Sequence, residues 1–194
     1  MSTVPIFADE EWRLPSRGKV AMLSLIAGEC GIFSIFVAAY LYYIGRSISG
    51  PAPSILEAPI FNTVCLLSSS LTIWLAEREI ERGRMRAFGA WWGFTILLGL
   101  IFIAGTALEW HTLIYRHGLT IRTNLFGTTF YSLVGLHATH VIVGLTGLSA
   151  IMIFTLLGRV NRSHAERIQV FSMYWHFVDA VWVVVFIVVY VVGR

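Results

Sequence analysis

The sequence predicts an all-α integral membrane protein, a bundle of five transmembrane helices. Three observations lead to this fold class: an apolar composition, five long apolar segments and a one-sided distribution of basic residues. Of the 194 residues, 57% are hydrophobic and only 13% are charged, and the mean hydropathy is +0.74. One soluble core of this length cannot bury so much apolar surface, so a lipid bilayer is expected to surround the rest.

The five predicted spans follow from the length that a helix needs to cross a bilayer, about 20 mostly apolar residues. The segments that meet this requirement are 20–44, 59–76, 87–108, 128–157 and 171–192. The second is short and could continue as helix through 77–84. Residues 1–19 are then a cytoplasmic N-terminal tail, and 20–194 form one transmembrane domain. The first apolar run is too long for a signal peptide and carries Glu29, so no cleavable signal is expected.

The basic residues predict the orientation of the bundle. Ten of the 14 Lys and Arg residues lie in the N-terminal tail and in the second and fourth loops, and four lie on the other side, namely Arg46, Arg116, Arg122 and Arg194. Since positive charge stays on the cytoplasmic side, the N-terminus is predicted to be cytoplasmic and the C-terminus periplasmic. The net charge of +3 is too small to indicate a nucleic-acid partner.

A few ionisable side chains fall where lipid should reject them. They are Glu29 in the first span, Glu109 at the end of the third, His137 and His140 in the fourth, and His176 and Asp179 in the fifth. A charged residue at a helix centre costs about 2.5–3.5 kcal/mol on insertion scales. Each should therefore face the bundle interior and either find a partner or be neutral.

Two of these pairs have the spacing of neighbours on one helical face. His137 and His140 are three residues apart, as are His176 and Asp179. A metal or haem site is one interpretation, since imidazoles ligate copper and haem iron. The fourth span is dense in small residues, which bring helices too close for a cofactor. Interhelical hydrogen bonding is therefore favoured, with metal or haem binding and proton relay as the alternatives.

Glu29 has no charged neighbour within its own span. Because burial disfavours a charged carboxyl, Glu29 is expected either protonated or ionised against a histidine of the fourth span. His140 is the leading candidate, because it also lies in the middle of its span. Ser68 and Thr72, in a hydroxyl-rich stripe of the second span, are predicted to hydrogen-bond across helices, and Asp179 to accept from a Trp, Ser or His.

Two long motifs in the last spans resemble those of the haem–copper respiratory oxidase subunit III family. Residues 130–144 read FYSLVGLHATHVIVG, similar to that family's aromatic pair and Gly-x-His-x-x-His-Val pattern, and residues 174–182 read YWHFVDAVW, similar to its C-terminal signature. Glu29, the FNT of 61–63, the serine stripe and Glu109-Trp110 also fit, so the resemblance covers roughly residues 20–194. The mitochondrial-type member has seven helices, and the likeness is to the five-helix bacterial form of cytochrome c oxidase subunit III.

The resemblance implies an accessory subunit of a proton-pumping terminal oxidase in the bacterial inner (plasma) membrane. Such a subunit has no catalytic, metal or cofactor-binding residues of its own; haem and copper lie in partner subunits. It would contact subunit I directly, together with subunit II, and support the stability and proton uptake of subunit I. Membrane lipid is a further partner. Bound phospholipid in a cleft would need a neighbouring subunit to supply the two missing helices.

Other functions stay open at this point. Within the superfamily, the alternatives are subunit III of a quinol oxidase and the membrane protein associated with nitric oxide reductase. From other classes, the alternatives are a haem-binding membrane redox protein and a proton transporter. Neither has support from extra ligand sets, an inverted repeat or broken helices in the sequence.

Overall fold

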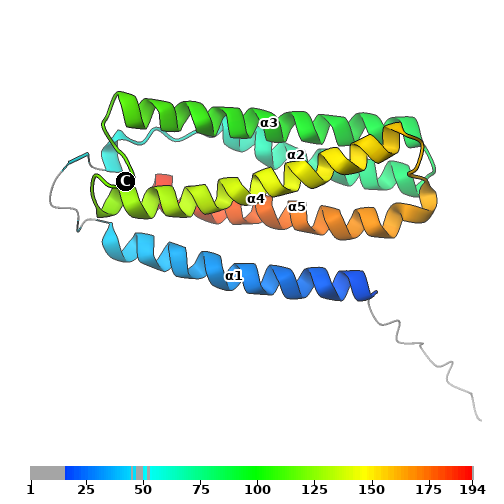
Figure 1. Ribbon diagram of the computed structural model, residues 1–194, viewed down its shortest axis with the longest axis horizontal. Coiled ribbons are helices and arrows are strands. Elements are labelled where there is room, and N and C mark those ends of the chain that lie inside the picture. Colours follow the sequence, from blue (N-terminus) through cyan, green and yellow to red (C-terminus); the bar gives the residue numbers. More distant parts are fainter. Residues whose placement is uncertain (1–15, 45, 47–49, 52, 194) are drawn as a thin grey trace, which may run out of the picture.

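Five long helices run side by side, alternately up and down, in the computed structural model (Figure 1). The structure describes residues 16–44, 46, 50–51 and 53–193. The long helices are α1 (Arg17–Tyr43), α2 (Ile60–Glu81), α3 (Met85–Tyr115), α4 (Leu125–Leu156) and α5 (Ala165–Phe186). Shorter elements are η1 (Pro53–Ile55), η2 (Arg162–His164) and η3 (Ile187–Val192), a π-helical end to α5. All five spans are long and apolar enough to cross a membrane, which confirms the predicted fold class.

The bundle places α4 and α5 between two flanking parts. The antiparallel pair α2 and α3 packs on one side, through α2 against α5 and α3 against α4, and α1 packs alone on the other side against α4 and α5 (Figure 1). The most apolar stretch of α1 is only 6% buried, against 44% for the last span. The chain itself therefore leaves most of α1 open to lipid or to another protein.

The helices are longer than the apolar segments that predict them. α1 begins at Arg17, where the side chain of Ser16 accepts a hydrogen bond from the backbone of Lys19, so the predicted tail boundary at residue 19 falls within the first turn. Residues 1–15 of that tail lie outside the described residues. α2 continues to Glu81, and α3 and α5 also extend past their predicted limits. Hydropathy marks only the part of a helix within hydrocarbon, whereas the helix continues into the polar interface.

Three fully buried tryptophans lock the helices together, because each indole N–H has a partner on another helix. Trp92 of α3 donates to the carbonyl of Leu148 at 2.9 Å. Trp175 and Trp182 of α5 donate to hydroxyls of α2, on Ser69 at 2.8 Å and on Thr63 at 3.1 Å. A buried indole that lacked a partner would lose the hydrogen bond it makes to water. These bonds therefore fix both the spacing and the rotation of the helices.

Glycine allows the closest of these contacts. A Cβ at Gly144 of α4 would lie 2.7 Å from the ring of Trp175, and one at Gly105 of α3 would lie 2.1 Å from the side chain of Asn62. Both distances are shorter than a van der Waals contact, so any side chain there would force the helices apart. The predicted role of small residues in close helix packing holds at these positions.

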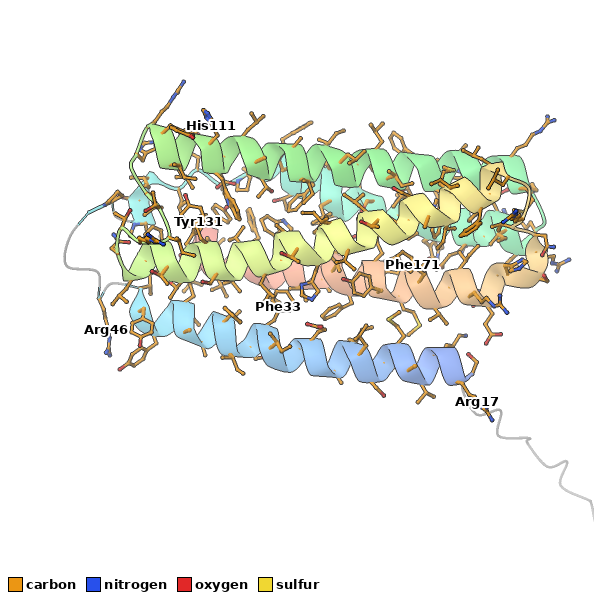
Figure 2. The ribbon with its side chains drawn as sticks, viewed as in Figure 1. Arg17, Phe33, Arg46, His111, Tyr131 and Phe171 are labelled. Carbon is orange, nitrogen blue, oxygen red and sulfur yellow. The ribbon has the colours of Figure 1, made fainter. Side chains whose placement is uncertain are left out.

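Phe33 is the main apolar anchor of the loosely covered α1. It is 5% exposed and points from α1 into the bundle (Figure 2). Its ring lies 5.1 Å from the ring of His140 on α4 and 6.5 Å from that of Phe177 on α5. Phe33 lies one turn after Glu29 in α1. The apolar contact of Phe33 and the polar contact of Glu29 are therefore both made to His140.

Candidate functional site

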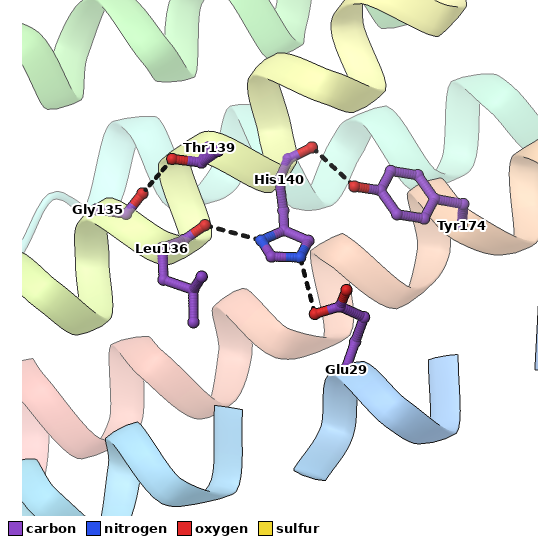
Figure 3. Close-up of polar contacts among 6 residues, drawn as sticks. All are labelled: Glu29, Gly135, Leu136, Thr139, His140 and Tyr174. Atoms are coloured by element: carbon purple, nitrogen blue, oxygen red, sulfur yellow. Dashed lines mark hydrogen bonds and ion pairs between the residues drawn. The ribbon is translucent and has the colours of Figure 1, made fainter. Parts of the chain in front are cut away.

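Glu29 and His140 meet in the middle of the bundle (Figure 3). The Glu29 carboxyl oxygen Oε2 lies 3.0 Å from Nε2 of His140, across the interface between α1 and α4. Glu29 is twelve residues into α1, so it lies about 18 Å from the start of the helix at 1.5 Å per residue. His140 lies halfway along α4. The structure thus brings together Glu29 and His140, which the sequence analysis pairs because both lie within the interior of their spans.

The other contacts of His140 determine where its protons lie. Nδ1 is 2.8 Å from the carbonyl of Leu136, and a carbonyl only accepts, so Nδ1 carries a hydrogen and donates it. Nε2 then either accepts a proton from a protonated Glu29 or, in an imidazolium, donates one to the carboxylate. In both cases a single proton lies between Oε2 and Nε2, and the pair as a whole is neutral.

The Glu29–His140 pair is only partly covered by this chain. The Glu29 side chain is 22% exposed and that of His140 is 14% exposed. A cavity of about 250 Å³ opens beside them, lined by Leu25, Thr139, Val143 and Tyr174 as well as by the pair. The hydroxyl of Tyr174 donates to the backbone carbonyl of His140 at 3.2 Å, which ties α5 to the same place (Figure 3). The contact between Glu29 and His140 is therefore open to the side of the bundle.

A second polar cluster joins α2 to α5 and is centred on Asp179, which is 3% exposed. Its oxygen Oδ2 accepts from the hydroxyl of Ser70, in a short hydrogen bond, and lies 3.4 Å from that of Ser69. Nδ1 of His176 is 3.0 Å from the Ser70 hydroxyl. Since Ser70 gives its one hydrogen to Asp179, His176 donates to Ser70. The other Asp179 oxygen, Oδ1, has no hydrogen-bond partner among the described residues.

His137 does not make the predicted interhelical hydrogen bond. It is fully buried, and neither ring nitrogen has a partner in the part of the chain that the structure describes. Its ring stacks on Trp182 at 5.0 Å and meets the edge of Phe102 at 5.8 Å. His137 is turned toward α3 and α5, whereas His140 is turned toward α1. The two residues differ by 60° around α4, and this is enough to place them against different helices.

The hydroxyl stripe of α2 also differs in part from the prediction. Ser68 is on the exposed side of α2, and no hydrogen bond of its side chain is found within the described ranges, so its predicted interhelical role is wrong. Ser69 and Ser70 take that role, with Trp175 as an additional partner that the sequence did not single out. Thr72 is 2.7 Å from Thr95 of α3, as predicted for an interhelical contact. Nothing in the stripe itself distinguishes Ser68 from its two neighbours.

Glu109 lies near the end of α3 and contacts η3, the last helical segment of the described chain. Its oxygen Oε1 accepts a hydrogen bond from the hydroxyl of Tyr190, in η3, at 2.7 Å. This contact crosses from α3 to the π-helical end of α5. In the described part of the chain, no group of three His, Cys, Asp or Glu residues is arranged to hold a metal ion.

Comparison with known proteins identifies the family. A family model described as cytochrome c oxidase subunit III matches residues 48–194. Cytochrome c oxidase subunit 3 of Bacillus sp. (strain PS3) is 34% identical over 195 residues, which covers 98% of this chain and 94% of the relative. The protein of the same name from Alkalihalophilus pseudofirmus is 33% identical over 171 residues, 87% of this chain and 83% of the relative. The chain belongs to the cytochrome c oxidase subunit III family.

Proposed function

We propose that this chain is the accessory subunit III of a proton-pumping haem–copper cytochrome c oxidase and holds no redox centre itself. Its family membership supports a place in an oxidase complex. The matched relatives are named as subunits of cytochrome c oxidase, which favours cytochrome c over quinol as the electron donor and does not favour the nitric oxide reductase protein. Haem and copper lie in subunits I and II, with subunit I in direct contact.

The environment of the histidines supports this assignment. Both nitrogens of His140 are engaged by protein groups, on Leu136 and Glu29, and Nδ1 of His176 is engaged by Ser70. The ring of His137 is enclosed by Trp182 and Phe102. A haem or copper ligand in these places would first have to break hydrogen bonds or displace packed rings. We therefore propose that these side chains join helices and ligate no cofactor.

The observation that carries a role in proton uptake is the 3.0 Å contact between Glu29 and His140 in the middle of the bundle, beside a cavity on its side. The proton can move between Oε2 and Nε2 without changing the net charge of the pair, so the low dielectric of the membrane opposes the move only weakly. We propose that the pair both anchors α1 and keeps a proton available near subunit I.

Glu29→Ala and Glu29→Gln test this role in the purified oxidase. Glu29→Ala should leave His140 without its partner, costing about 1–3 kcal/mol, and reduce retention of the subunit in the complex. Glu29→Gln still offers His140 a hydrogen-bond partner but cannot lose a proton to it. If proton exchange matters, Gln should be as harmful as Ala to activity over many turnovers while the subunit stays bound.

The haem spectrum of the same preparations is the control. It should remain that of the wild-type complex in both variants, since subunit I is proposed to hold the haems. A spectrum that changes while the subunit is still bound would contradict the accessory role. Full turnover stability in Glu29→Gln would restrict Glu29 to anchoring.

We also propose the orientation that the basic residues indicate, in the bacterial inner membrane. Matched cysteines at Arg82 and Arg122, in a chain whose Cys30 and Cys65 are replaced by Ser, test it. Both positions are exposed and lie at opposite ends of the bundle. An impermeant maleimide added to intact cells should label the Cys at 122 and not the Cys at 82. The reverse pattern would overturn the orientation.

A further inference from the structure

His176 places a polar atom on the outer side of the bundle in the middle of the membrane. It lies about 20 Å from either end of the last span, Arg162–Val192, at 1.5 Å per residue. Its Nδ1 is 3.0 Å from the hydroxyl of Ser70 on α2, whereas Nε2 has no hydrogen-bond partner among the described residues. The bundle encloses both nitrogens of His137, but it does not enclose Nε2 of His176. This nitrogen is therefore accessible at the surface of the bundle.

The hydrogen bonds inside the cluster determine what the outward nitrogen offers. Ser70 donates to the Asp179 carboxyl, and Nδ1 of His176 donates to Ser70. Because a net charge in the middle of a membrane is costly, an ionised Asp179 requires an imidazolium, which carries a hydrogen on Nε2 as well. Transfer of a proton along the chain to Asp179 reverses both bonds and leaves the hydrogen on Nε2. In each neutral state of the cluster, His176 presents an N–H donor outward.

Exposed apolar side chains of two neighbouring helices surround His176. With Ser70 and His176 they are spaced three or four residues apart, so they share one side of each helix. They are Leu67 and Trp74 of α2, and Ala180 and Val183 of α5. Ala180, one turn after His176, carries only a methyl group, so another helix can approach closely at this point. We refer to these four residues, together with Ser70 and His176, as the His176 face.

We propose that a membrane-spanning helix of a neighbouring oxidase subunit packs on the His176 face and accepts a hydrogen bond from Nε2 of His176. The acceptor is an oxygen of a hydroxyl, amide or carboxyl side chain in the middle of that helix. The packed helix covers the apolar side chains of the face. Its acceptor extends the chain of hydrogen bonds that runs from Asp179 through Ser70 to His176.

Lipid does not meet the requirement of this face. Acyl chains contain no hydrogen-bond acceptor, and the oxygens of the headgroup region lie about 15 Å from the midplane of the hydrocarbon core. A donor left against hydrocarbon loses the hydrogen bond that it makes to water. A symmetric contact with a second copy of this chain would bring two equal donors together. The inference rests on membership of an oxidase complex and not on the role proposed for Glu29.

Two substitutions of His176 separate its inward hydrogen bond from its outward one. His176→Asn places an amide near the position of Nδ1 and keeps the bond to Ser70, whereas His176→Gln extends an amide to the position of Nε2. In the purified oxidase, His176→Asn should raise the dissociation constant of the subunit about three- to fifteenfold, the value of one hydrogen bond within a membrane. His176→Gln should be retained nearly as wild type. Serial dilution of the complex in mild detergent measures the retention of the subunit.

Unfolding of the isolated subunit, by titration with a denaturing detergent, is the control for folding. His176→Asn should unfold close to wild type, because its contact with Ser70 is kept, and His176→Gln should be the less stable of the two. Retention of His176→Asn equal to that of wild type would overturn the proposal. So would a loss of retention that only follows the loss of stability in the two variants.

Ala180→Leu and Ala104→Leu test the helix contact itself. Both alanines are exposed, but Ala104 lies on α3, outside the His176 face. Ala180→Leu should reduce retention of the subunit in the same dilution, because the larger side chain keeps the partner helix away from His176. Ala104→Leu should be retained as wild type. Equal loss in both variants would indicate a general effect of added apolar bulk and would contradict the proposal.

Photocrosslinking identifies the partner. Benzoylphenylalanine in place of Val183 should crosslink, in the purified oxidase, to a membrane-spanning segment of another subunit. Peptide mass spectrometry should find a residue with a side-chain oxygen within about one helical turn of the crosslinked position. Adducts with lipid alone, or with a second copy of this chain, would show that no helix of another subunit covers the His176 face.

Discussion

Asp179 and Glu29 are carboxyl groups within the membrane part of this bundle, and their surroundings differ. Asp179 is 3% exposed and has two serine hydroxyls of α2 beside it, one of them held in turn by Trp175. Glu29 has one partner, His140, and is 22% exposed next to a cavity. The first arrangement places two hydroxyls beside one oxygen of a buried carboxyl, and the second joins a partly exposed carboxyl to a single imidazole. Carboxyl groups of the same chemistry thus join two closely packed helices in one place and hold the loosely covered α1 in the other.

The α2–α5 interface, which contains Asp179, and the interface of α1 with α4, which contains Glu29, also differ in how deeply their helices are buried. In α2 and the last span, which Asp179 joins, 33% and 44% of the most apolar stretch is buried, whereas only 6% of that of α1 is. Loss of a hydrogen bond between α2 and α5 therefore leaves groups that neither water nor lipid can satisfy. Loss of a hydrogen bond between α1 and α4 can be relieved by movement of α1 or by a neighbouring subunit.

The largest effect is expected for Asp179→Ala. It removes the acceptor of Ser70, whose hydroxyl also holds His176, and should lower the free energy of unfolding by about 2–3 kcal/mol. Asp179→Asn keeps an acceptor oxygen and should cost less than half as much. Unfolding of the purified protein in a detergent titration measures both. An Asp179→Ala protein as stable as wild type would mean that the cluster does not lock α2 to α5.

Coupling between Glu29 and His140 should be smaller. A double-mutant cycle with Glu29→Ala and His140→Ala is expected to give an interaction energy of about 0.6–1.7 kcal/mol, the range of hydrogen bonds within membranes. Glu29→Ala combined with Asp179→Ala, which share no partner, should be additive. A coupling near zero in the first cycle would show that α1 is held by Phe33 and its apolar neighbours alone.

Trp175→Phe should destabilise the bundle by about 1 kcal/mol, because it removes the donor to Ser69 within the α2–α5 seam. Trp91→Phe provides the comparison, since Trp91 is 38% exposed and its indole has no hydrogen-bond partner among the described residues. The same detergent titration should show almost no change for Trp91→Phe. Equal effects would attribute the loss at Trp175 to ring size and not to the hydrogen bond.

The smallest effect is expected at His137. His137→Phe replaces one ring with another between Trp182 and Phe102, and no hydrogen bond within the described residues is lost. The free energy of unfolding should change by less than about 1 kcal/mol. His140→Phe, three residues away, should be the more harmful of the two in the same titration. A severe loss at His137 would reveal a polar partner for its nitrogens.

The sequence predicts well what depends on depth and length. Apolar segments long enough to cross a bilayer predict the five helices, and equal depth in two spans predicts that Glu29 meets His140. The prediction fails where the rotation of a helix decides the contact. Ser68, Ser69 and Ser70 differ by 100° steps around α2, and only packing against α5 determines which of them reach Asp179. The rotation of α4 likewise decides that His137 packs against Trp182 and that His140 meets Glu29, and the sequence does not reveal it.

The helix lengths show a similar division. The interior of each span is evident from hydropathy, but the polar turns that extend α3 to Tyr115 and start α5 at Ala165 look like loop residues in the sequence. Their helical form depends on caps and on neighbouring helix ends that composition does not reveal.

The π-helical end of α5 connects the end of α5 to the end of α3. In η3 the backbone hydrogen bonds reach five residues back, so each turn accommodates one more residue than an α-helix does. Tyr190 lies in this π-helical segment, and its hydroxyl donates to Glu109. Deletion of one residue from 187–189 would turn Tyr190 by about 100° away from Glu109, while Asp179 and Trp175, earlier in α5, would keep their register. A change in the length of η3 can thus alter the contact between the end of α5 and α3 and leave the contacts of α5 with α2 in place.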